Sequence, residues 1–138
     1  MRAQLILVFI IAVCGVMPDC RTYGETQMKM AADVCHELEI SNAEMKKVYS
    51  DILKERGNDK TFTDALIRAQ SAWTSFRDAH MEALYPSPPE VYGSSHGMCR
   101  CTVLNRMTRE RIETLRTWLS GGVEGDLCAG STGRKGEQ

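Results

Sequence analysis

The chain has 138 residues, of which 43% are hydrophobic and 25% charged, as expected for one ordinary soluble domain. Its 17 Lys and Arg residues nearly balance its 18 Asp and Glu residues, for a formal net charge of -1. This balance excludes the strongly basic surface typical of nucleic-acid-binding proteins, so no nucleic-acid partner is expected.

Residues 1–15 are predicted to be a signal peptide. Arg2 precedes an apolar run over 5–13, which is too short to cross a bilayer and has the length of a signal-peptide core. Cleavage after Cys14 or after Gly15 is open, and a buried N-terminal helix of a cytosolic protein is the alternative. Neither Cys14 nor Cys20 directly follows a small residue, so no lipid anchor is expected. We expect export to the periplasm or the extracellular space, with membrane contact through the signal peptide only.

Export determines how the six cysteines are interpreted. In an oxidising compartment cysteines form disulfides by default, rather than metal sites. Cys99 and Cys101 are too close in sequence to pair without strain, so each is expected to have another partner. If Cys14 leaves with the signal peptide, the count is odd, and one thiol is free or pairs between chains. The disulfide candidates are Cys20, Cys35, Cys99, Cys101 and Cys128.

The mature chain begins with helical periodicity. Apolar residues recur at three- and four-residue steps over 28–38, which predicts a first short helix. Ser41 and Glu44 have the spacing of a capping box, and this pattern predicts a break or kink near Ser41. A second helical segment follows over 45–53, with Gly57 placed to end it as a left-handed C-cap.

A further long helix is predicted to follow a polar turn. Either Asp59 or Thr61 can cap it. It should stop at Tyr85, because Pro86 disfavours helical geometry in the residue before it. Prolines, glycines and serines then predict a loop up to Gly97, either a surface connection or a binding element.

The last helix is predicted to begin near Ser95 and to end at Gly121 and Gly122. The Gly-rich segment 121–138 is expected to be a largely disordered tail. The fold class is therefore all-α, with residues 16–120 forming a small bundle of three to four helices. Disulfides are expected to staple this bundle because its core is small.

Three stretches, in order, resemble the lysozyme inhibitor LprI N-terminal family and together cover nearly all of residues 19–119. The first combines Asp19-Cys20 and Cys35 with a helix centred on Tyr49. The second is Ala69-Gln70-Ser71-Ala72-Trp73-Thr74-Ser75-Phe76-Arg77-Asp78, similar to the family pattern A-Q-x-x-W-x-x-[FY]-R-D. The third combines Gly93-Ser94 with Met107-Thr108-Arg109-Glu110-Arg111 and Leu115. The resemblance implies a bacterial cell-envelope binding protein with a helical fold.

One feature of the family pattern is absent from this chain. Family members commonly place a cysteine three residues after the Arg-Asp pair, and that position is Met81 here. A bridge from this helix to the last one is therefore not expected. The expected disulfides are Cys20 with Cys35, and Cys128 with one of Cys99 or Cys101.

The motif residues suggest either packing or recognition. Gln70, Trp73 and Arg77 lie at i, i+3 and i+7, so they share one helix face. An arginine on such a seam lays its stem along apolar surface and offers its planar head to an acceptor, and Arg111 is similarly placed. In the simpler interpretation Gln70, Arg77 and Arg111 hold helices together; in the alternative they form a polar recognition patch. The residues expected in the core are Tyr49, Trp73, Phe76 and Leu115.

No catalytic or metal site is expected. His96, Cys99 and Cys101 offer metal ligands, but no second well-spaced pair accompanies them. A Cys–His nucleophile would lack a third orienting group. The methionines mostly fall on apolar stripes and are interpreted as core. We therefore expect neither enzymatic activity nor a cofactor.

The resemblance implies lysozyme inhibition through protein–protein association. Such an inhibitor must fill a cleft lined by catalytic carboxylates, which favours a protruding loop with hydrogen-bond donors. The loop 85–97, with Tyr92, Ser94 and His96, is the candidate, and its prolines limit the entropy lost on docking. A plain link between two helices is the alternative for this loop. The rival function is a non-inhibitory structural or adaptor module of the envelope; the lysozyme type and the oligomeric state are left open.

Overall fold

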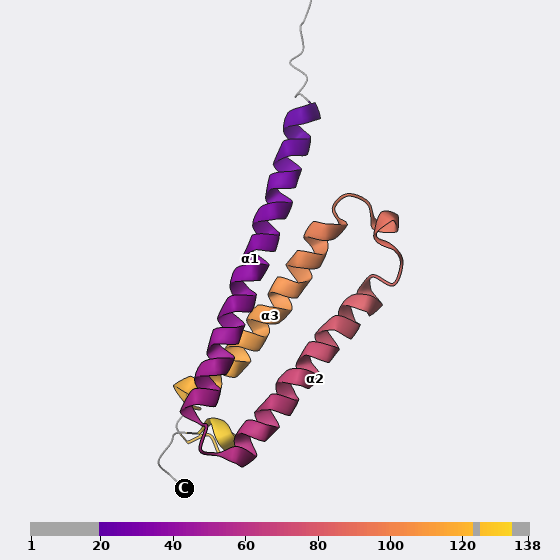
Figure 1. The fold of residues 1–138 in the computed structure, drawn as a ribbon. Helices are drawn as coiled ribbons and strands as arrows, with labels where there is room; N and C mark the ends of the chain where they lie inside the picture. The colour runs from indigo at the N-terminus through magenta and orange to yellow at the C-terminus, as the bar shows by residue number, and fades with distance from the viewer. Residues whose placement is uncertain (1–19, 123–124, 134–138) are drawn as a thin grey trace, which may run out of the picture.

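The chain folds into three long helices, of which the first and third run in one direction and the second runs in the opposite direction (Figure 1). A computed structural model describes residues 20–122 and 125–133. No β-strand occurs within these ranges, so the predicted all-α bundle is confirmed. α1 and α3 pack side by side in the same direction, and α2 returns between their ends (Figure 1). The elements are α1 (Cys20–Glu55), α2 (Lys60–Leu84), the 3-10 helix η1 (Pro89–Tyr92), α3 (His96–Ser120) and the 3-10 helix η2 (Gly130–Thr132).

The predicted signal peptide, residues 1–15, lies outside the described residues. Among the helices that the structure describes, none combines the length and apolar character needed to span a bilayer.

The break predicted near Ser41 is wrong, because α1 continues unbroken for 36 residues. The Ser41 side chain is buried, and its hydroxyl donates a hydrogen bond to Asn105 Oδ1 of α3 at 2.6 Å. The hydroxyl therefore joins two helices instead of capping one. Two ion pairs, Glu37 with Arg109 and Glu44 with Arg116, add to the same interface.

The predicted left-handed C-cap at Gly57 is also wrong. Gly57 is not among the glycines with positive φ in the described chain. The chain leaves α1 through a turn in which the Arg56 N–H donates to Ile52 O and the Asp59 N–H donates to Arg56 O. This hydrogen-bonded turn satisfies the helix end without a left-handed residue.

The other boundaries follow the local signals. Asp59 caps α2 by accepting a hydrogen bond from the Phe62 N–H at 3.0 Å. α2 ends at Leu84 with Tyr85 as its C-cap, as the following proline predicts. α3 ends before Gly121, whose φ of 84° requires the conformational freedom of glycine.

The hydrophobic core lies at the end of the bundle where α1 turns into α2. All three helices contribute to it, and Leu115 is completely buried there. Tyr49 and Trp73 are half-buried and pack against this core. Its buried members are Met45, Val48, Ile52, Leu66, Ile112 and Leu115.

The placement of Phe76 in the core is wrong, because its side chain is 60% exposed. The α2 face that turns inward carries Leu66, Trp73 and Met81. Phe76 lies at the flank of this face, about 80° around the helix axis from Leu66 and further from Met81, so its side chain is left at the surface. Its described ring neighbour is His80, at 5.9 Å between centroids.

The described part of the Gly-rich tail folds back on the core end. Trp118 Nε1 donates to Ser131 Oγ at 3.0 Å, and Arg56 donates to Ser131 O at 2.9 Å. Gly122 permits this contact, since a Cβ there would come within 2.9 Å of the Ala129 side chain. The expectation of disorder over 123–124 and 134–138 concerns residues outside the described ranges.

One disulfide staples the bundle, and it joins Cys35 of α1 to Cys101 of α3. The expected pairing of Cys20 with Cys35 is wrong, because both lie on one helix, about 22 Å apart along its axis. The expected bridge from Cys128 is also wrong. Cys99 and Cys128 are free, and Cys128 belongs to the tail that folds onto Trp118, about 25 Å along α3 from Cys101.

Candidate functional site

The loop between α2 and α3 forms a compact projection, and we call its residues 86–95 the hook. Three rings hold its ends together: Tyr85 at the end of α2, Tyr92 in η1 and His96 at the start of α3. Tyr92 stacks on His96 with centroids 4.9 Å apart, and Tyr85 meets both rings edge-on at 5.3 and 4.8 Å. The Ser87 N–H also donates to the Tyr92 hydroxyl at 2.9 Å. The hook is therefore held in one shape before any partner binds.

The outer surface of the hook is exposed. Val91 at its tip is 68% exposed, and Glu90 beside it is exposed as well. At the base, Ser94 and Ser95 present exposed hydroxyls next to the first turn of α3. Gly93 makes the turn between tip and base, with a φ of 76°. The hook thus presents Val91 and Glu90 at its tip and two serines at its base.

A groove of about 500 Å³ lies between the hook base and α1. Its α1 wall comes from the helix end that extends past the start of α3 (Figure 1). Its floor is mostly apolar, with three methionines, and its polar edge includes Ser94 and Ser95. The lining residues are Gly24, Thr26, Gln27, Met28, Met30, Ala31, Ser94, Ser95 and Met98.

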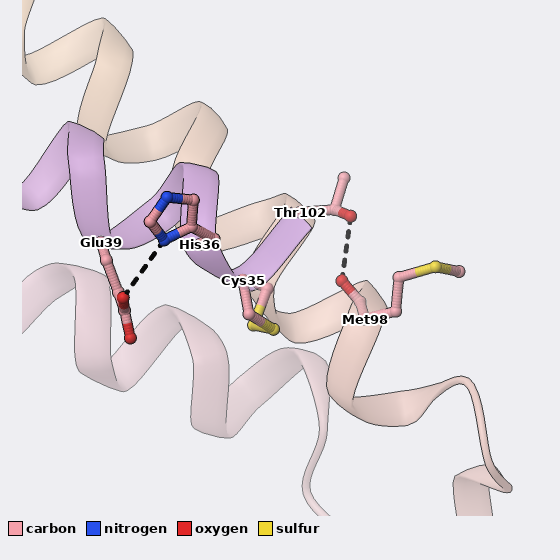
Figure 2. Close-up of a disulfide and its surroundings, with 6 residues drawn as sticks. Cys35, His36, Glu39, Met98 and Thr102 are labelled. Carbon is pink, nitrogen blue, oxygen red and sulfur yellow. Dashed lines mark hydrogen bonds and ion pairs between the residues drawn. A yellow bond between two sulfur atoms is a disulfide. The ribbon is translucent and has the colours of Figure 1, made fainter. Parts of the chain in front are cut away.

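The disulfide lies about one helical turn beyond this groove. Ala31 precedes Cys35 by one turn of α1, and Met98 precedes Cys101 by about one turn of α3. Figure 2 shows Met98 beside the bridge, with its carbonyl accepting a hydrogen bond from Thr102 Oγ1 at 2.9 Å. On α1, His36 pairs with Glu39 at 3.6 Å on the exposed surface (Figure 2). The bridge therefore fixes the two walls of the groove in register.

Hook, groove and disulfide all lie within the segment that the model of the family "Lysozyme inhibitor LprI" matches, residues 19–115. This segment is more than two thirds of the chain. The chain belongs to the LprI family. No match was found among the curated proteins or among the solved structures.

In this LprI family member, the polar motif residues lie around Trp73 where α2 packs against α3, and we call Gln70, Trp73, Arg77 and Arg111 the seam. Arg111 Nε donates to Gln70 Oε1 at 3.0 Å, and its guanidinium lies 5.9 Å from the centroid of Trp73. The Arg77 guanidinium lies 5.3 Å from the same ring and pairs with Asp78 at 2.9 Å. Arg111 Nη2 is buried with no hydrogen-bond partner in the described structure, and burial lowers the pKa of this guanidinium.

The contacts of Arg111 with Gln70 and Trp73 join α3 to α2, whereas the contacts of Arg77 with Trp73 and Asp78 stay within α2. The structure does not bring these residues to the hook or the groove. Of the three loop residues expected to bind, Ser94 is exposed on the groove edge. Tyr92 and His96 face each other inside the ring cluster and serve to shape the hook.

Sequence reasoning missed the methionine lining of the groove. Met28 and Met30 are 75% and 53% exposed, so their interpretation as core is wrong. The groove could have been predicted from the unequal lengths of α1 and α3, but the break predicted at Ser41 divided α1 into two short helices. A helix of 36 residues packed beside one of 25 must extend beyond it and leave part of its face uncovered.

The described residues carry no group of three or more His, Cys, Asp or Glu side chains arranged to hold a metal ion. His96 Nδ1 is buried and has no hydrogen-bond partner there. Its two ring neighbours are Tyr85 and Tyr92. The arrangement offers shape, apolar contact and hydrogen-bond donors, which are the means of protein recognition.

Proposed function

We propose that this LprI family member is an exported protein of the cell envelope that inhibits a lysozyme by binding it through the hook. The observation that carries the proposal is the preformed hook, which projects the exposed Val91 side chain and two exposed serines from a disulfide-linked bundle. The family description supplies the class of partner. The predicted signal peptide and the disulfide support an exported location.

The chemistry of the hook base suits a lysozyme cleft. Glycosidases of this kind place a pair of carboxyl groups on either side of the bond that they cleave. Ser94 and Ser95 offer hydroxyl donors to such groups. The His96 N–H at the start of α3 already donates to Gly93 O at 3.2 Å. The N–H groups of Gly97 and Met98 in the same first turn have no intrahelical acceptor and carry the positive end of the helix dipole.

The rigidity of the hook supports tight binding. Three packed rings and prolines already fix its backbone, so little conformational entropy is lost on docking. Because Val91 is 68% exposed, we expect it to enter the cleft first and the serines at the base to reach the polar groups of its walls.

The test is a titration of c-type, g-type and i-type lysozymes with the oxidised chain lacking residues 1–15, scored by cell-wall lysis. We expect stoichiometric inhibition of one type. Val91→Glu should weaken it at least about tenfold, which corresponds to about 1.4 kcal/mol. Ser94→Ala with Ser95→Ala should also weaken it, because both hydroxyl donors are lost.

Ser50→Ala is the matched control, because Ser50 is also exposed but lies on α1 near the core end. The near-ultraviolet circular dichroism of the chain, to which Tyr85 and Tyr92 contribute with its other tyrosines and tryptophans, should be unchanged in all variants. Full inhibition by the Val91 and serine variants would contradict the hook as the contact. No inhibition of any lysozyme would favour the alternative function, a non-inhibitory structural or adaptor module.

A further inference from the structure

We infer that the methionine-lined groove is a second contact surface, which receives an apolar segment of the same lysozyme that the hook engages. The inference rests on the proposed function and adds to it the part of the partner that is recognised. Four observations carry it: the continuity of the groove with a packed interface, its lining, its edge and its disulfide.

The groove continues the α1–α3 interface. Cys35 marks the α1 face that turns toward α3, and Ala31, Met28 and Gly24 lie on this face at helical steps before it. Below Cys35 the same face packs against α3. On the N-terminal side of Cys35, α3 reaches only as far as its first residue, His96, and no other described helix takes its place. An interhelical packing face is thus left open for another chain.

The methionines that line the groove differ from those of the core in their exposure to solvent. Met45, Met81 and Met107 are buried among the helices. Met28 and Met30 stand at the groove, largely exposed to solvent. Methionine side chains are flexible and polarisable, so they adapt to the shape of an incoming apolar segment.

The residues at the edge of the groove favour one occupant, the protein that the hook binds. Ser94 and Ser95 belong both to the hook base and to the groove lining. A protein that contacts these serines therefore also covers the mouth of the groove. This continuity favours the partner of the hook over a second copy of the chain or the chain's own N-terminal residues.

The Cys35–Cys101 disulfide fixes the position of the two groove walls relative to each other before a partner binds. It ties the two walls together one turn from Ala31 and Met98. The walls therefore need not be ordered by the partner, which reduces the entropic cost of association.

The test uses the oxidised chain carrying methyl-¹³C methionine, titrated with the inhibited lysozyme of the c-, g- and i-type panel. We expect the methyl resonances of Met28, Met30 and Met98 to shift on binding. The resonances of the buried Met45, Met81 and Met107 should stay in place and serve as an internal control. Binding without shifts at the groove methionines would overturn the inference and leave the hook proposal standing.

A blocking variant tests the groove independently of the spectra. A Cβ at Gly24 meets no atom within 4 Å, so Gly24→Leu can enter the open space without a backbone clash. Leucine also favours helix over glycine, so the variant should fold at least as well as the parent. We expect it to weaken lysozyme binding at least about tenfold, while the matched Gly24→Ala control binds nearly as the parent does.

The remaining outcomes are also decisive. Equal affinity of Gly24→Leu and Gly24→Ala would overturn the groove contact. Groove shifts that depend on protein concentration without lysozyme would assign the groove to a second copy and overturn the inference. If no lysozyme binds at all, the proposed function fails and the inference fails with it.

Discussion

The two ends of the bundle are stabilised by different means. At the core end, apolar side chains from all three helices bury one another, and the tail adds contacts to Trp118 and Arg56. At the hook end, α2 lies apart from α1 (Figure 1), and a disulfide and three packed rings hold the elements in place. Burial therefore stabilises one end, while a few specific contacts shape the other.

This difference separates stability from recognition. A surface that must bind a partner leaves apolar groups uncovered, as Val91, Met28 and Met30 are here. Such a surface cannot also supply the burial that keeps the bundle folded. The disulfide instead links α1 to α3 covalently at the open end, and the buried apolar side chains at the core end supply most of the hydrophobic stabilisation of the fold.

Removal of the disulfide should lower the stability of the hook end, and it is the largest of the three effects that we expect. Cys35→Ala with Cys101→Ala opens a loop with a sequence separation of 66 residues, which lowers the free energy of unfolding by about 4 kcal/mol. Urea denaturation measures this loss. Amide hydrogen exchange should show the greatest gain in α1 before Ala31. Equal gains at Ile52 would contradict a specific role at the hook end.

Truncation at the core end should have the next largest effect. Leu115→Ala leaves a cavity in the fully buried centre and lowers the free energy of unfolding by about 3 kcal/mol. Met28→Ala is the matched control, because it removes an exposed apolar side chain and should change stability by less than about 0.5 kcal/mol. Thermal or urea denaturation checks both variants. Comparable losses from the two would show that the groove is packed in solution.

The smallest effect is expected in the seam. Gln70→Ala removes the acceptor of Arg111 Nε and leaves a half-buried cation with one contact fewer, at a cost of about 1–2 kcal/mol. Arg111→Met removes the cation itself and its unpaired Nη2, so stability should change little. Denaturation in urea compares the two. A larger loss from Arg111→Met would show that the contact with Trp73 dominates this seam.

Local signals in the sequence were sufficient for much of the fold. The helical period, the Asp59 cap, Pro86 and Gly121 placed both ends of α2 and the end of α3. These signals act within one or two turns, so no tertiary information is needed to interpret them. The ordered motifs likewise indicated the family that the matched segment confirms.

Interpretation from local spacing failed where the same side chain could serve either its own helix or a contact with a neighbouring helix. Ser41 has the sequence context of a helix cap, yet its hydroxyl bonds to Asn105 across the α1–α3 interface. Phe76 follows an apolar pattern, yet α2 has only one inward face in a three-helix arrangement. Which use prevails depends on the neighbouring helix, and local spacing does not contain that neighbour.

The candidate site was partly accessible from sequence. The loop composition indicated the hook, and Ser94 lies on its exposed base. The roles of Tyr92 and His96 in shaping the hook depend on ring contacts that join the ends of two helices. The groove was not accessible, because it requires an unbroken α1 and the register in which α3 begins beside it.

The sequence by itself determined the helical class, most helix ends and the family, since these depend on residues close together in the chain. Only the tertiary structure decided the disulfide pairing, the exposure of Phe76 and the open groove. The exposure of Phe76 follows from the single inward face of α2. The disulfide and the groove follow from the parallel register of α1 and α3, which brings Cys35 to Cys101 and lets α1 extend past the start of α3. That register is set by burial at the far end of the bundle, where residues distant in sequence pack together.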